Sequence, residues 1–110
     1  MNFNKNDILL VTFPYSDLSN TKKRPALVVK DIEGSNTILC QITTKKRNMS
    51  KYEVELKKES CKGDIRFDSF IYVDMIYTLH SSLIIRKIGE ITDSKTKMNV
   101  DDRLKTLFFE

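Results

Sequence analysis

Several residue types that carry catalytic chemistry are scarce in this chain. Among its 110 residues there are one histidine, three glycines, two cysteines and no tryptophan. A ribonuclease mechanism that needs two histidines is therefore excluded, and three isolated glycines do not form a phosphate-binding loop. The sequence has no G-x-S-x-G motif, which argues against a serine hydrolase. His80 lies in the turn-like segment TLHSSL and is interpreted as a surface residue.

Metal-binding patterns are also missing. Cys40 lies in an apolar run and Cys61 in the polar segment KESCKGD, and neither has a Cys or His neighbour at zinc-ligand spacing. The acidic residues Asp64, Asp68 and Asp74 are too sparse to predict a metal-dependent nuclease. We expect no metal and no other cofactor.

Long hydrophobic runs are absent as well. The N-terminal apolar run, Ile8 to Phe13, is too short for the core of a signal peptide or for a bilayer span. The composition, 40% hydrophobic and 31% charged, is typical of a globular protein, and a chain of this length can bury one compact core. We therefore expect one domain, residues 1–110, in the cytoplasm.

Positive charge is concentrated in the first half of the chain. Residues 1–60 contain eleven Lys or Arg against seven Asp or Glu, whereas residues 61–110 contain eight of each. The excess gathers at 22–24 and 45–47, each time within the tetrapeptide TKKR. This asymmetry indicates a face for an anionic partner, although a merely solvated lysine-rich surface is the alternative.

The first three-quarters of the chain read as short strands separated by turns. Pro25 fits at the start of the second strand, where a missing N–H costs the sheet least. The segment 59–64 reads as a turn or insertion, and a single turn is expected after a strand within 70–79. The predicted strands are 7–14, 24–30, 37–43, 51–58, 70–79 and 83–91.

The tail, residues 92–110, is predicted to be an amphipathic helix. Val100, Leu104, Leu107 and Phe108 recur at the spacing of one helical face, and Thr92 or Asp93 can cap its start. Several short strands, one long loop and a terminal helix together predict a small curled β-barrel with a C-terminal helix.

The two TKKR segments are expected to meet in space. If the second and third strands are antiparallel neighbours, Arg24 at the start of one lies close to Thr43 and Thr44 at the end of the other. Arginine offers a planar set of donors that matches a phosphate, and a threonine hydroxyl can donate to a phosphate oxygen. The pattern therefore predicts a phosphate site at this end of the sheet.

The neighbouring residues favour a nucleic acid as the partner. The cationic residues beside the two threonines and Arg24 would attract a phosphodiester backbone; they are Lys22, Lys23, Lys45, Lys46 and Arg47. Phe13, Tyr15, Tyr52 and Tyr72 are candidates for stacking unpaired bases, although strand-face packing is the more frequent role of such residues. A single strand rather than a duplex is the partner that this combination favours.

The order of these segments resembles the MazF/PemK family of toxin–antitoxin ribonucleases. NDILLVTFPYSDLSNTKKRPALVV is similar to the family's opening, and LCQITTK, KYEVEL, FIYVDMIYTL and LIIRKIGEI follow at approximately the family's spacing. The resemblance implies a mainly β, SH3-like barrel of the PemK/CcdB kind, usually a homodimer. It further implies metal-independent cutting of single-stranded RNA through the ribose 2′-hydroxyl, and neutralisation by a small antitoxin.

The resemblance also implies roles for individual residues. The family's essential arginine falls on Arg24 and its essential threonine on Thr43, with Thr44 as the neighbour most easily confused with it. A family aspartate falls on Asp74, where it would support the site or contact a base. Arg24 would stabilise charge on the phosphorane, and Thr43 would donate to a non-bridging oxygen.

Two segments depart from the family pattern. The first loop reads SDLSNTKK where many members have Gly-x-Glu-Gln, and Tyr72 stands where some members have a catalytic arginine. A tyrosine can donate a proton or stack a base, but it has no permanent positive charge. The alternative hypothesis is therefore a barrel that binds RNA or a protein without cutting, including a toxin directed at gyrase.

Overall fold

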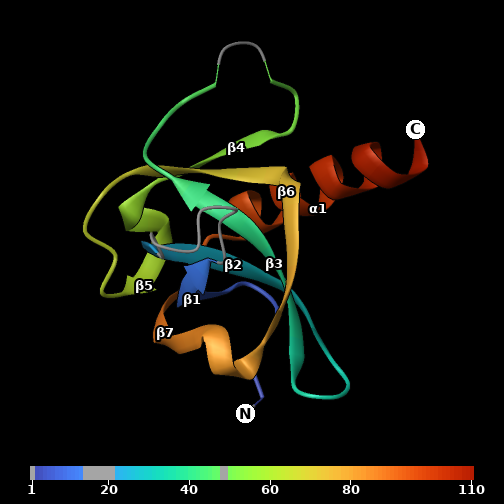
Figure 1. Ribbon diagram of the computed structural model, residues 1–110. Helices are drawn as coiled ribbons and strands as arrows, with labels where there is room; N and C mark the ends of the chain where they lie inside the picture. The colour runs from blue at the N-terminus through green and yellow to red at the C-terminus, as the bar shows by residue number, and fades with distance from the viewer. Residues whose placement is uncertain (1, 14–21, 48–49) are drawn as a thin grey trace.

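The computed structural model describes residues 2–13, 22–47 and 50–110, and within them the strands form one antiparallel sheet followed by a helix (Figure 1). The strand order across the sheet is β4-β6-β3-β2-β1-β7-β5. The elements are β1 Asp7–Phe13, β2 Lys22–Ile32, β3 Asn36–Thr43, β4 Glu53–Leu56, the 3₁₀ turn η1 Lys58–Ser60, β5 Cys61–Gly63, β6 Ser69–His80, the 3₁₀ turn η2 Ser81–Leu83, β7 Ile84–Ile91 and α1 Ser94–Phe109.

The strong curl of this sheet comes largely from β6. Its C-terminal half pairs with β3 from Asn36 to Cys40, and its N-terminal half pairs with both β3 and β4. Between Cys40 and Gln41 the register jumps from Ile76 to Tyr72, so β6 carries extra residues and bends there. Figure 1 shows the two halves of β6 running in different directions. The predicted curled sheet is confirmed, and the ladders leave β4 and β5 as its two edges, so it is not a closed barrel.

Both faces of the sheet are buried against apolar clusters, which explains the continuous apolar runs in β1 and β2. Adjacent residues of one strand enter opposite clusters: Ile8 belongs to one and Leu9 to the other. The first cluster also contains Val100 of α1 and the second contains Val11 and Ala26. A strand that is buried on both faces loses the alternation of polar and apolar residues.

Three predicted boundaries were wrong. β2 begins at Lys22, so Pro25 is not at the start of the strand but is its fourth residue. The β2–β3 ladder ends at Ala26, next to Pro25, which has no backbone N–H to donate. The segment 59–64 contains the short strand β5 as well as part of a turn. The strand expected within 70–79 is longer, because β6 continues to His80 with a change of register, and the 3₁₀ turn η2 follows it directly.

The C-terminal helix begins as predicted and packs differently. Asp93 is the N-cap, and its carboxylate accepts hydrogen bonds from the N–H of Thr96 at 2.9 Å and from its hydroxyl at 2.6 Å. Val100 is buried, but Phe108 is 61% exposed, so the predicted apolar face does not extend to the end of the helix. Figure 1 shows the C-terminal end of α1 extending away from the strands.

Candidate functional site

Arg24 lies near the start of β2 and Thr43 is the last residue of β3, and these two strands are antiparallel neighbours. The β2–β3 ladder pairs Ala26 with Gln41, and this register, continued by two residues, sets Arg24 opposite Thr43. On its other side Arg24 is paired with Val11 of β1. The arrangement predicted for the start of β2 and the end of β3 is therefore present, because an antiparallel pairing brings these two strand ends together.

The hydroxyl of Thr43 has a fixed acceptor role and a hydrogen left to donate. Its Oγ1 accepts the backbone N–H of Lys45 at 3.2 Å, and the residue is 8% exposed. Arg24 is half-buried, and its Nε is buried without a hydrogen-bond acceptor among the described residues. Both side chains are held by the strands that carry them, and both retain donors that a bound group can use.

The predicted lysines surround this pair. Lys22 and Lys23 precede Arg24 within β2, whereas Lys45 and Lys46 follow β3, and all of them are exposed. Two cationic segments that are distant in sequence thus converge on one end of the sheet. Such a cluster attracts a polyanion by a long-range, salt-dependent force. Thr44 is also exposed, and it lines a cavity described below rather than joining Thr43.

Arg47, which was predicted to bind RNA, already has partners within the chain. Its guanidinium forms a bidentate ion pair with Asp74, at 2.9 Å from Nη1 to Oδ2 and 2.6 Å from Nη2 to Oδ1. The same guanidinium lies over the ring of Tyr72, with its Cζ 3.9 Å from the ring centroid. A carboxylate therefore already binds one N–H of each terminal nitrogen, and the assignment of Arg47 to RNA binding stays a prediction.

This ion pair shifts the titration of both partners. The hydrogen bonds from Arg47 lower the pKa of Asp74 from its usual value, although partial burial acts in the opposite direction. The hydrogen bond to Asp74 likewise raises the pKa of Arg47. The pair is therefore ionised near neutral pH, and its net charge is close to zero.

Further contacts hold the segment between Thr43 and Arg47 against the sheet. The Tyr72 hydroxyl donates to the backbone carbonyl of Lys45, and the Arg47 N–H donates to the Glu53 carboxylate at 2.7 Å. Glu53 is a residue that sequence reasoning missed, because the pairing of β4 with β6 alone brings it here. The loop that carries the second cationic segment is consequently anchored at both ends of its described part.

Two of the four predicted stacking aromatics, Phe13 and Tyr72, are buried. Phe13 is 3% exposed and packs edge-on against Tyr77, with ring centroids 4.8 Å apart. Tyr72 is 8% exposed beneath Arg47. These two stacking predictions were wrong, because the curled sheet buries the face that carries both rings. Tyr52 is half-buried, with the Lys51 Nζ 5.3 Å from its centroid, and Tyr15 lies outside the described residues.

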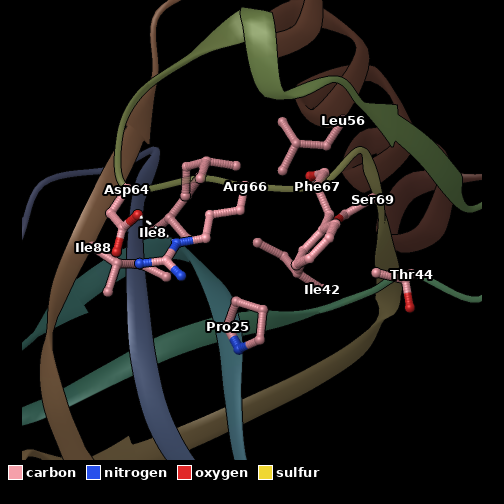
Figure 2. A pocket seen from close by; sticks show the side chains of 11 residues that line it. Ile8, Pro25, Ile42, Thr44, Leu56, Asp64, Arg66, Phe67, Ser69 and Ile88 are labelled. Atoms are coloured by element: carbon pink, nitrogen blue, oxygen red, sulfur yellow. Dashed lines mark hydrogen bonds and ion pairs between the residues drawn. The ribbon is translucent and has the colours of Figure 1, made fainter.

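An apolar cavity of about 280 Å³ lies on the opposite face of the same sheet end (Figure 2). Ile42 and Phe67 point into it, while Pro25 and Thr44 lie at its rim. The Arg66 guanidinium bonds Asp64 across 3.0 Å at its edge. The cavity is lined mostly by apolar residues and could hold an apolar group. Arg24 and Thr43 do not line it, because they lie on the other face of the sheet.

Metal-type clusters and membrane-spanning helices are both absent from the described part of the chain. In residues 2–13, 22–47 and 50–110, no three His, Cys, Asp or Glu side chains gather as a metal would require. Over the same ranges no helix has the length and hydropathy needed to cross a membrane.

Comparison with protein families identifies the chain at the level of its family. Residues 4–108 match the model of the PemK-like, MazF-like toxins of type II toxin–antitoxin systems. The chain belongs to this family. No curated protein sequence matches it.

Several solved structures share this fold. An endoribonuclease in complex with its cognate antitoxin from a mycobacterial species is 17% identical, with a TM-score of 0.73 over 96% of this chain and 95% of that one. The Mycobacterium tuberculosis toxin MazF-mt6 is 19% identical, with a TM-score of 0.72 over 93% and 95%. MazF from Deinococcus radiodurans is 17% identical, with a TM-score of 0.73 over 97% and 96%. At these identities the likeness establishes the mainly β MazF-like fold with its C-terminal helix.

Proposed function

We propose that this PemK-like, MazF-like toxin is a metal-independent endoribonuclease that cuts single-stranded messenger RNA in the cytoplasm. The observation that carries the proposal is the position of Arg24 at the start of β2, next to the end of β3 that carries Thr43, with four exposed lysines around this sheet end. Family membership and the mycobacterial neighbour described as an endoribonuclease support the same reaction. The domain that performs it spans residues 1–110.

In the proposed reaction the ribose 2′-oxygen attacks the adjacent phosphorus. The new O2′–P bond forms as the P–O5′ bond breaks, which leaves a 2′,3′-cyclic phosphate and a 5′-hydroxyl. The 2′-hydroxyl proton is lost during attack, and the leaving 5′-oxygen gains a proton. The transient phosphorane carries extra negative charge on its non-bridging oxygens, and catalysis consists largely of stabilising that charge.

Arg24 and Thr43 would supply this stabilisation. The guanidinium of Arg24 stays charged at any working pH and can donate two parallel hydrogen bonds to phosphate oxygens. Its high pKa makes it a poor general base, so its electrostatic role is the stronger one. The hydroxyl of Thr43 accepts from Lys45 and is left to donate its own hydrogen to a non-bridging oxygen.

The partners follow from the same surface. A partly disordered acidic segment of a cognate antitoxin would cover the lysines around Arg24 and block RNA. The mycobacterial neighbour is described with its cognate antitoxin, which supports this arrangement. A homodimer is proposed as well, with the exposed Phe108 and Phe109 as apolar surface that a second copy could cover.

A second candidate is an RNA-binding barrel that does not cut. The ion pair between Arg47 and Asp74 favours it, because the cation beside Tyr72 is neutralised rather than free. Such a module would keep the lysine cluster and its affinity for a polyanion. It would lack the second permanent charge that some family members place at the position of Tyr72.

The deciding experiment is incubation with a long single-stranded RNA in EDTA, beside Arg24→Ala, followed by mapping of the product ends. Cuts at a short motif with 5′-hydroxyl ends, absent from the variant, would support the ribonuclease. Intact RNA that is shifted on a gel would support the binding module instead. Circular dichroism and size-exclusion chromatography of Arg24→Ala would verify that the loss of cutting is not a loss of fold.

A further inference from the structure

The guanidinium of Arg47 is already occupied on most of its surface. Its two terminal nitrogens bind the two oxygens of Asp74, one of its faces lies on the Tyr72 ring, and its Nε is buried. The side chain nevertheless remains 29% exposed. We propose that the outward face of this guanidinium is a stacking platform for an unpaired RNA base next to the cut phosphate.

The contacts of Arg47 favour a base over a phosphate. A phosphate binds best through two parallel in-plane donors, and the pair on the two terminal nitrogens is already directed at Asp74. The ion pair is nearly neutral, so a second anion gains little by approaching it. A flat, delocalised cation still stacks well on a neutral aromatic ring, and single-stranded RNA is commonly read by stacking on such planes.

The platform lies within reach of the proposed cutting site. Tyr72 is paired with Gln41, which is two residues before Thr43 on β3 and on the same face of the sheet. Two residues along a strand span about 7 Å. The base of a nucleotide that flanks the phosphate at Arg24 and Thr43 can therefore reach Arg47. This inference rests on the proposed function, since it places a part of the same RNA.

The platform is also rigid before RNA arrives. The backbone N–H of Arg47 is held by Glu53, and the Tyr72 hydroxyl holds the carbonyl of Lys45 on the same loop. Asp74 fixes the plane of the guanidinium from its edge. A preformed surface requires little ordering when a base stacks on it, so more of the stacking energy appears as affinity.

The test uses a 2′-O-methylated oligonucleotide that spans the mapped cut and cannot be cleaved through its 2′-oxygen. Abasic residues replace the bases one position at a time, and the Kd is measured for the wild type, for Arg47→Lys and for the neighbouring variant Lys46→Gln. Lysine keeps the charge and can still pair with Asp74, but it has no plane. Arg47→Gln, which can still hydrogen-bond Asp74, is measured as well, and it replaces Arg47→Lys if the lysine variant does not fold.

We expect one abasic position to weaken wild-type binding about 10-fold, and Arg47→Lys to weaken binding of the intact oligonucleotide by a similar factor. When Arg47→Lys is measured with the abasic oligonucleotide, the Kd should rise no more than with either change alone, because both changes remove the same interaction. The slope of log Kd against log salt should be unchanged by Arg47→Lys. Lys46→Gln should reduce that slope by about 0.7 and keep the abasic effect.

Other outcomes separate the platform from the proposed function. If RNA is cut but Arg47→Lys binds the oligonucleotide with the wild-type Kd, the platform is overturned and the ribonuclease stands. The same holds if the loss of affinity caused by Arg47→Lys adds fully to the loss caused by each abasic substitution. If Arg47→Gln lowers the salt slope as Lys46→Gln does, Arg47 binds a phosphate and the platform is again overturned. A wild-type chain that neither cuts nor binds RNA would overturn both.

Discussion

The hydroxyl of Thr43 and the backbone N–H of Lys45 are joined by a hydrogen bond of 3.2 Å. This bond fixes the direction of the hydroxyl, because the oxygen accepts from one side and its hydrogen must point elsewhere. It also ties the last residue of β3 to the loop that carries the second cationic segment. One side chain thus has both a structural acceptor role and a free donor.

Substitution of Thr43 separates these two roles. Thr43→Val keeps the shape of the side chain and removes the donor, so we expect the kcat for RNA cleavage to fall about 100-fold. It also leaves the Lys45 N–H unpaired, at a cost of about 1 kcal/mol in the free energy of unfolding. Thr43→Ser should retain most of the activity. Cleavage kinetics and urea denaturation measure both effects, and equal kcat values for Ser and Val would exclude a donor role.

The four exposed lysines should set the salt dependence of RNA binding. Replacement of Lys22, Lys23, Lys45 or Lys46 by Gln should reduce the slope of log Kd against log salt by about 0.7 for each phosphate that the lysine neutralises. Lys95→Gln, on the exposed start of α1, is the matched control. Fluorescence anisotropy between low and moderate salt measures the slopes. A control variant that changes the slope as much as the others would contradict a localised RNA face.

The ion pair between Arg47 and Asp74 should make stability depend on pH. The pKa of Asp74 is lowered in the folded state, whereas an unfolded aspartate titrates near about 3.9. The stabilisation is therefore complete above about pH 5 and is lost as the pH falls below about 4 through the folded pKa. We expect the difference in unfolding free energy between wild type and Asp74→Asn to shrink from pH 5 to pH 3. A difference that stays constant over this range would show that the pair is not formed.

The thiol of Cys40 should be inert in the folded protein. Burial, with a smaller effect from the charge of Asp74, raises its pKa to about 12, and burial raises the pKa of Cys61 to about 11. The thiolate is the reactive form, so at pH 8 both should alkylate far more slowly than a free cysteine. In urea both should react at the ordinary rate. Mass spectrometry of iodoacetamide-treated Cys61→Ser isolates Cys40, and fast labelling without urea would refute its burial.

Much of the fold was predictable from local patterns. The apolar runs of β1, β3 and β7 and the cap at Asp93 have signals within a few residues, so they were predicted near their observed positions. β5 was missed because three residues with one glycine carry no periodicity, and its pairing with β7 alone makes it a strand. The bend of β6 was not predicted, because the register shift that causes it lies in the pairing with β3.

The sequence by itself determined that the strand ends carrying Arg24 and Thr43 meet, because antiparallel neighbours bring the start of one strand to the end of the other. Only the tertiary structure decided the state of Arg47. Asp74 is far from it in sequence, and the curl of β6 brings that carboxylate and the Tyr72 ring against its guanidinium. A charge is visible in a sequence, whereas its partner depends on contacts between distant strands.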